Sequence, residues 1–216
     1  MIERKYYIPR IGLSLLIGLL SLLMYQHLFN LVNNTTLTSL LIFSFISLIL
    51  IFINYNLLIL HINRAKLYKN SLKHIVFAFV CGVCILTINH FLLHGFVPTI
   101  DQYLVSKYTL LVPLALITFS FNYIFSYTLL YKVLTDKIKF ENNHKLTIIV
   151  TCAVFALLLG LFLPNLITSF FNNFILYLSI FLVISICYNS SHNLFIGMFG
   201  ISLSFFLYNL IILISF

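Results

Sequence analysis

Two histidines, at positions 90 and 94, have the spacing of a metal-binding pair. His90 and His94 stand four residues apart, so a helix would place both imidazoles on one face. His27 and Asp101 would add two further ligands if all four residues lie on the same side of a membrane. A two-histidine spacing is weak evidence, however, because histidine at a membrane surface ordinarily hydrogen-bonds headgroups or water. We therefore expect neither a bound metal nor another cofactor.

A pair of cysteines in the same part of the chain has the CxxC spacing of redox-active dithiols. Cys81 and Cys84 form this pair, and Cys152 and Cys187 are the other two cysteines. The pair falls in the middle of an apolar segment, where no nearby charge favours the thiolate. A buried cysteine then behaves as a small apolar residue that lets membrane helices approach closely. We therefore interpret both cysteines as helix-packing residues.

Small and amide residues in the last apolar segment are suited to contacts between helices. Gly197 and Gly200 give this segment a small-residue face, and Asn209 can hydrogen-bond across helices. We interpret these three residues as sites of helix packing or partner binding. All four acidic residues lie outside the apolar segments. Their position removes the groups that most often relay protons or couple ions inside a membrane.

The composition of the chain excludes a water-soluble fold. Of its 216 residues, 62% are hydrophobic and 7% are charged, and the mean hydropathy is +1.12. Soluble domains carry about a quarter charged residues. The apolar segments approach the roughly 20 residues that cross hydrocarbon as a helix, and they lack the alternation of membrane β-strands. The sequence therefore predicts an all-α membrane protein with a single domain spanning residues 1–216.

Polar breaks divide the chain into about seven apolar segments, which we expect to form a bundle of transmembrane helices. The predicted spans are Ile11 to Val32, Leu37 to Ile62, Ile75 to Phe96, Tyr108 to Leu134, Leu146 to Leu163, Phe174 to Tyr188 and Leu194 to Ser215. The sixth span is short. It lies between predicted polar breaks at Pro164 to Asn173 and Asn189 to Asn193.

Basic residues concentrate at breaks that share one side of the predicted bundle. They are Arg4, Lys5, Arg10, Arg64, Lys66, Lys69, Lys73, Lys132, Lys137, Lys139 and Lys145. Only Lys107 falls on the other side, so the positive-inside rule places the N-terminus in the cytoplasm and Phe216 outside. This orientation explains the formal charge of +8, with attraction to the lipid bilayer as an addition. We expect no binding of nucleic acid.

Two stretches in the second half of the chain have the apolar pattern of a known family. Residues 122–131, Asn-Tyr-Ile-Phe-Ser-Tyr-Thr-Leu-Leu-Tyr, resemble the motif Glu-Glu-Leu-x-Phe-Arg-Gly-Leu-Leu. Residues 154–159, Val-Phe-Ala-Leu-Leu-Leu, are similar to Phe-Ala-Leu-Leu-His. These are motifs of the CPBP, or Abi, intramembrane proteases, and the resemblance covers residues 108–216. It implies a CPBP-like helical core in that part of the chain.

The residues that carry catalysis in that family are replaced in this chain. Asn122, Tyr123 and Tyr127 stand where the first motif has its acids and its arginine. Phe155 of the second motif is kept, but Leu159 stands in place of the histidine. The family's chemistry needs a carboxylate and imidazoles to activate water, and neither leucine nor tyrosine takes a proton from water at neutral pH. The resemblance therefore implies a pseudoprotease and not an enzyme.

Three functions remain open for such a membrane protein. The first is a catalytically inactive CPBP-like regulator or scaffold of another membrane or cell-envelope protein, including a role in bacteriocin immunity. The alternative is the membrane subunit of a transporter, an ABC-type exporter or a small permease, although no Gly- and Pro-rich broken helix supports it. The third is an enzyme that uses the outer His27, His90, His94 and Asp101. Abundant Ile, Phe, Asn and Lys are typical of AT-rich bacterial genomes, so we expect a bacterial cytoplasmic membrane.

Overall fold

The structure is a computed structural model, and it describes three continuous parts of the chain. These are residues 55–93, 144–160 and 166–214; the further described residues are 45, 48–49, 51–53, 116–117, 120–121, 124 and 128. In these residues the chain forms helices joined by turns, without a strand. The predicted all-α fold class is therefore confirmed. The number of seven helices and the orientation of the N-terminus stay predictions.

Six helical elements fall within the described residues. They are α3 (Tyr55–Leu67), α4 (Ser71–Ile88), the π-helical turn η1 (Asn89–Leu93), α8 (His144–Gly160), α9 (Leu166–Ser191) and α10 (Leu194–Ile214). Three stretches are long and apolar enough to cross a membrane: Ser71–Phe91, Phe170–Ser191 and Leu194–Ile214. The chain is accordingly a multi-pass membrane protein.

The sixth span is longer than the sequence indicates. We expect it to begin at Phe174, but α9 begins at Leu166 and ends at Ser191, so it has 26 residues. The predicted break from Pro164 to Asn173 is therefore wrong from residue 166 onward. The polar residues of this predicted break do not end the helix. Asn173 is fully buried inside the protein, and an α-helix satisfies its own backbone groups along its whole length.

The second predicted span also ends later than expected. The polar stretch after Ile62 is helical as far as Leu67, so that Arg64 and Lys66 lie in the last turn of α3. Long basic side chains allow this extension because their charged ends reach the headgroup region while the backbone stays helical. Only Tyr68, Lys69 and Asn70 separate α3 from α4.

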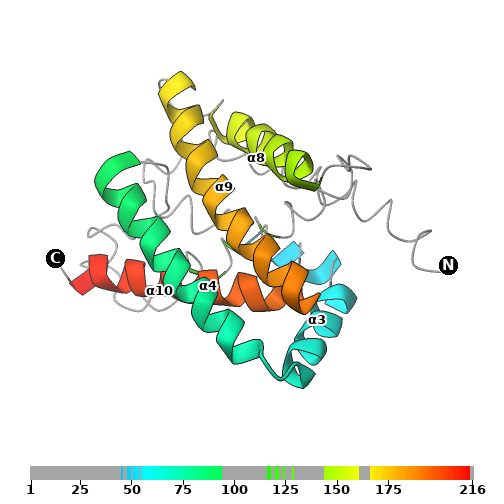
Figure 1. Ribbon diagram of the computed structural model, residues 1–216. Coiled ribbons are helices and arrows are strands. Elements are labelled where there is room, and N and C mark those ends of the chain that lie inside the picture. The colour runs from blue at the N-terminus through cyan, green and yellow to red at the C-terminus, as the bar shows by residue number, and fades with distance from the viewer. Residues whose placement is uncertain are drawn as a thin grey trace.

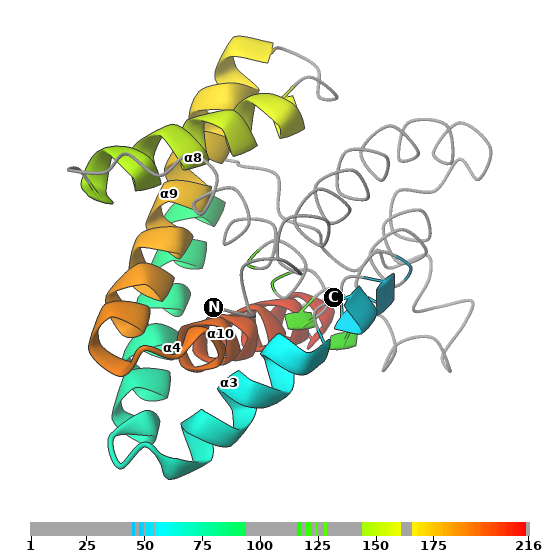
Figure 2. The same ribbon diagram turned by 90° about the vertical axis from the view of Figure 1, so that its right-hand side faces the viewer.

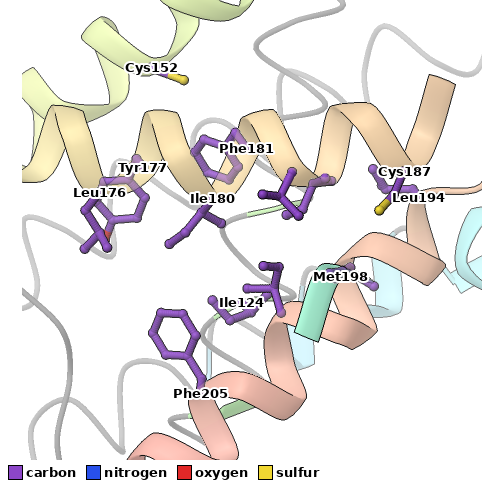
Figure 3. Close-up of a cluster of buried hydrophobic side chains, with 14 of the residues drawn as sticks. Ile124, Cys152, Leu176, Tyr177, Ile180, Phe181, Cys187, Leu194, Met198 and Phe205 are labelled. Atoms are coloured by element: carbon purple, nitrogen blue, oxygen red, sulfur yellow. The ribbon is translucent and has the colours of Figure 1, made fainter. Parts of the chain in front are cut away.

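α3, α4 and α9 pack against α10. Figure 1 and Figure 2 show α10 crossing α4 and the end of α9. α4 also contacts α9, and α8 lies along the first half of α9. Figure 3 shows the apolar side chains between these helices, with Ile180 of α9 directed toward Ile124 and α10. Met198 and Phe205 supply the α10 side of this core, at 1% and 0% exposure.

Glycines set the close approach of α10 to its neighbours. A Cβ atom added at Gly200 would lie 2.6 Å from both the Ala78 Cβ and the Ile75 carbonyl oxygen of α4. One added at Gly82 of α4 would overlap the Ser204 side chain of α10. Such spacing is the membrane form of helix packing, in which small residues let two backbones meet.

Candidate functional site

Two turns that are far apart in sequence meet at one end of the helices. The first is Tyr68–Asn70, between α3 and α4, and the second is His192–Asn193, between α9 and α10. The side-chain amide of Asn193 donates a hydrogen bond of 2.7 Å to the carbonyl oxygen of His61. The Tyr68 hydroxyl donates one of 3.4 Å to the carbonyl oxygen of Ser190. We call these two segments the paired turns.

Local chemistry explains why the second turn is so short. His192 has a φ of 50°, a left-handed conformation that commonly ends a helix. Its N–H donates a 2.7 Å hydrogen bond to the carbonyl oxygen of Tyr188. The next residue, Asn193, begins α10 as its N-cap, because its side-chain oxygen accepts a 2.9 Å hydrogen bond from the N–H of Phe195. Asn193 thus uses one end of its amide to begin α10 and the other end to bind α3.

The paired turns carry a concentration of positive charge. Arg64, Lys66, Lys69 and Lys73 all lie around the first turn and are exposed. No acidic residue occurs in the described parts of the chain, so none there neutralises these cations. Aromatic rings border them: Tyr68 and His74 have ring centroids 5.6 Å apart, and those of Tyr188 and His192 are 6.4 Å apart. The arrangement is suited to binding anionic groups.

The opposite end of α4 places one predicted histidine beside α10. His90 lies in η1, and its Nδ1 atom is 3.0 Å from the Tyr208 hydroxyl, a hydrogen bond. His94, His27 and Asp101 lie outside the described residues. Within the described part, histidines, cysteines and acids do not gather in any group of three that could hold a metal. His90 is used there as a contact between two helices.

Most polar side chains inside α8 and α10 bind the backbone of their own helix. Thr151 and Ser202 donate to the carbonyl oxygens four residues earlier, at 2.7 and 2.8 Å. Asn209, a predicted packing residue, donates a 3.0 Å hydrogen bond to the Phe205 carbonyl oxygen. Its side-chain oxygen is buried and accepts no hydrogen bond from the described residues. Such bonds satisfy polar groups inside a bilayer and supply little catalytic chemistry.

All four cysteines are free thiols. Cys152 and Cys187 are buried in the core, and Cys84 is exposed on α4. The Cys187 thiol lies 3.8 Å from the carbonyl oxygen of His74, at the distance of a weak S–H donor. This contact is one more link between α9 and the beginning of α4.

The residues at the family motif positions are placed only in part. Asn122, Tyr123 and Tyr127 lie outside the described residues. Phe155 and Leu159 lie one turn apart in the second half of α8. That half adjoins the beginning of α9, whereas α10 begins at the other end of α9 (Figure 2). In the described part, α8 packs along α9 and makes no comparable contact with α10.

The two predicted glycines are both turned inward. Gly200 faces α4, and Gly197 faces α9, where an added Cβ atom would lie 3.1 Å from the Cα atom of Ile184. Both residues are buried. A helix of another protein therefore reaches neither glycine while α10 keeps its neighbours, so any partner surface must involve other residues.

Sequence reasoning overlooked the paired turns themselves. Charge patterning does assign both turns to the same side of the membrane. The charge pattern does not reveal the hydrogen bond between Asn193 and His61, because the two residues are 132 positions apart in the sequence. The available signal was asparagine in both predicted breaks, with Tyr68 and His74 in or beside the first and Tyr188 and His192 in or beside the second.

These features define a helical, multi-pass membrane protein with a basic, polar surface at one end of its helices. No protein-family model, no curated protein and no solved structure matches the chain.

Proposed function

We propose that this chain is a catalytically inactive protein of the bacterial cytoplasmic membrane that regulates or scaffolds another membrane or cell-envelope protein. In this proposal it is a bundle of about seven transmembrane helices with a cytoplasmic N-terminus. The observation that carries the proposal is an exposed stripe of large side chains before and within α3. It consists of Phe45, Leu48, Phe52 and Tyr55.

The four residues of the stripe have the spacing of one helix face. They follow one another at intervals of three, four and three positions, which places them on the same side of a helix. Their exposed fractions are 58%, 67%, 83% and 55%. Intervals of three and four also let the side chains of one helix fit between those of another. The stripe is therefore suited to receive a helix of a second protein.

The chemistry of the stripe favours a protein partner over lipid. Aromatic rings gain energy from defined geometry against other side chains, which mobile acyl chains do not supply. Tyr55 also presents a hydroxyl that a polar side chain of a partner helix can hydrogen-bond, whereas a hydrocarbon chain cannot. Association inside a bilayer depends on such packing and hydrogen bonds, since lipid is as apolar as the helices.

The inactive character rests on the residues at the resembling motif positions. Leu159 stands where the family has a histidine, and Tyr123 stands where it has an acid. The buried hydroxyl and amide groups described in α8 and α10 bind their own backbone. A role that depends on contacts with another protein is consistent with both features, because such a role does not require the activation of water.

Site-specific photo-crosslinking in native membranes tests the proposal. We expect a benzophenone amino acid at Phe52 to give a discrete protein adduct that mass spectrometry identifies. The matched control is the same amino acid at Phe171, an exposed aromatic residue of α9 with 56% exposure. Lipid adducts alone at Phe52, or the same proteins at both positions, would contradict a specific partner surface. Capture of a transporter ATPase at Phe52 would instead favour the membrane subunit of an exporter.

A second experiment tests inactivity separately. The purified chain is incubated with the captured partner and with candidate membrane peptides. We expect no cleavage. Cleavage that is lost on Tyr123→Phe or Leu159→Ala would show that the chain is an active protease.

A further inference from the structure

We propose that the paired turns form a binding surface for the headgroups of anionic phospholipids. This inference does not rest on the proposed protein partner. It starts from the four exposed cations between residues 64 and 73, which have no acidic neighbour in the described part of the chain. Unpaired cations beside membrane-spanning helices attract anionic lipid.

The second turn adds polar groups to the same surface. The hydrogen bond from Tyr68 to Ser190 joins the first turn to the end of α9, and the one from Asn193 to His61 joins the second turn to α3. Ser190 and His192 are exposed there. The Ser190 hydroxyl already donates to the carbonyl oxygens of Ile186 and Cys187, so the donor that the second turn offers to a phosphate at this surface is the imidazole of His192. Such a donor adds direction to an attraction that charge alone leaves diffuse.

Two exposed leucines decide which anionic partner the surface fits. Leu67 and Leu72 are 87% and 71% exposed, and each is next in sequence to a cation, Lys66 or Lys73. At a bilayer boundary, leucine enters the acyl layer while the neighbouring cation remains among the phosphates. A soluble acidic peptide would pair with the cations but leave the leucines in water. The combination therefore favours a lipid surface over an acidic protein segment.

The proposal goes beyond the orientation of the chain. Positive charge orients a membrane protein during insertion and need not bind any lipid afterwards. A binding surface, in contrast, holds anionic lipid at equilibrium in the purified protein. It does so most strongly at low ionic strength, because salt screens exposed charges beyond about 10 Å at 0.1 M.

Lipid competition on the full chain tests this inference. The purified protein in neutral detergent is offered equal amounts of phosphatidylglycerol and phosphatidylcholine, and native mass spectrometry counts the bound molecules. We expect a severalfold preference for phosphatidylglycerol that falls toward one as salt is raised. Replacing Arg64, Lys66, Lys69 and Lys73 together by Gln should remove the preference. The matched variant with Lys66, Lys69 and Lys73 replaced by Arg should keep it.

Several results would overturn the inference. These are equal binding of both lipids by the wild type, a preference that survives the glutamine variant, and loss of preference in the arginine variant. Soluble glycerophosphate and polyglutamate are added as competitors. Displacement of the lipid by glycerophosphate at comparable concentration would assign the surface to free phosphate. Displacement by polyglutamate would assign it to an acidic protein segment.

Discussion

The side-chain amide of Asn193 donates a 2.7 Å hydrogen bond to the carbonyl oxygen of His61, and this bond joins the two hairpins α3–α4 and α9–α10. Both residues are buried, at 1% and 8% exposure. A polar contact away from water is costly to break, because the groups left behind are not solvated. Asn193 is therefore a sensitive position for testing the arrangement of the helices.

Replacing Asn193 separates its two tasks. Asn193→Ser keeps an oxygen that can cap α10 but loses the amide N–H group that binds His61. We expect a loss of about 1–3 kcal/mol in stability, the cost of an unsatisfied buried acceptor, measured as a lower melting temperature in detergent. Asn193→Ala should lose more, since the cap is removed as well. Equal melting temperatures for both variants and the wild type would show that the bond contributes nothing.

The contact between Gly82 and Ser204 predicts a rescue experiment. In Gly82→Ala the new methyl group overlaps the Ser204 side chain, which should cost about 1–3 kcal/mol through overpacking. Ser204→Gly removes that side chain, so the double variant should recover most of the lost stability. The double-mutant cycle on melting temperature measures this coupling. Additive effects of the two changes would contradict the close crossing of α4 and α10.

His90 should act as a structural residue that binds Tyr208. Tyr208→Phe removes the hydroxyl at 3.0 Å, and we expect a loss of about 1 kcal/mol, typical of a hydrogen bond between membrane helices. His90→Ala and His94→Ala together should leave the metal content unchanged, measured by elemental analysis of the purified protein. Stoichiometric zinc in the wild type that disappears in the double variant would establish a metal site instead.

The paired turns must share one side of the membrane, since a hydrogen bond joins each turn to the adjoining helix of the other hairpin. We expect cysteines introduced by Lys69→Cys and His192→Cys to be protected from an impermeant maleimide in intact cells and labelled after permeabilisation. A tag after Phe216 should be reached in intact cells, because the positive-inside rule places that end outside. Opposite behaviour of positions 69 and 192 would contradict the structure. A protected C-terminus would contradict only the count of seven spans.

The class of this protein followed from sequence because it depends on local properties. Apolar content and segment length alone require helices in a bilayer, where each backbone group must be satisfied within its own segment. Similar reasoning failed at the beginning of α9, because Asn172 and Asn173 resemble a break although they continue the helix. A polar residue ends a helix or lies buried inside it depending on its surroundings, and these come from other segments.

Charge, spacing and small residues in the sequence indicated which positions matter, and the tertiary structure decided what they contact. Gly200 is a small residue suited to helix packing, but its contact with Ala78 of α4 depends on how two helices that are distant in sequence cross. The pairing of His61 with Asn193 likewise arises when α3 and α10 are brought together. Contacts between residues far apart in sequence are fixed by the packing of whole helices, and no local pattern of residues contains that information.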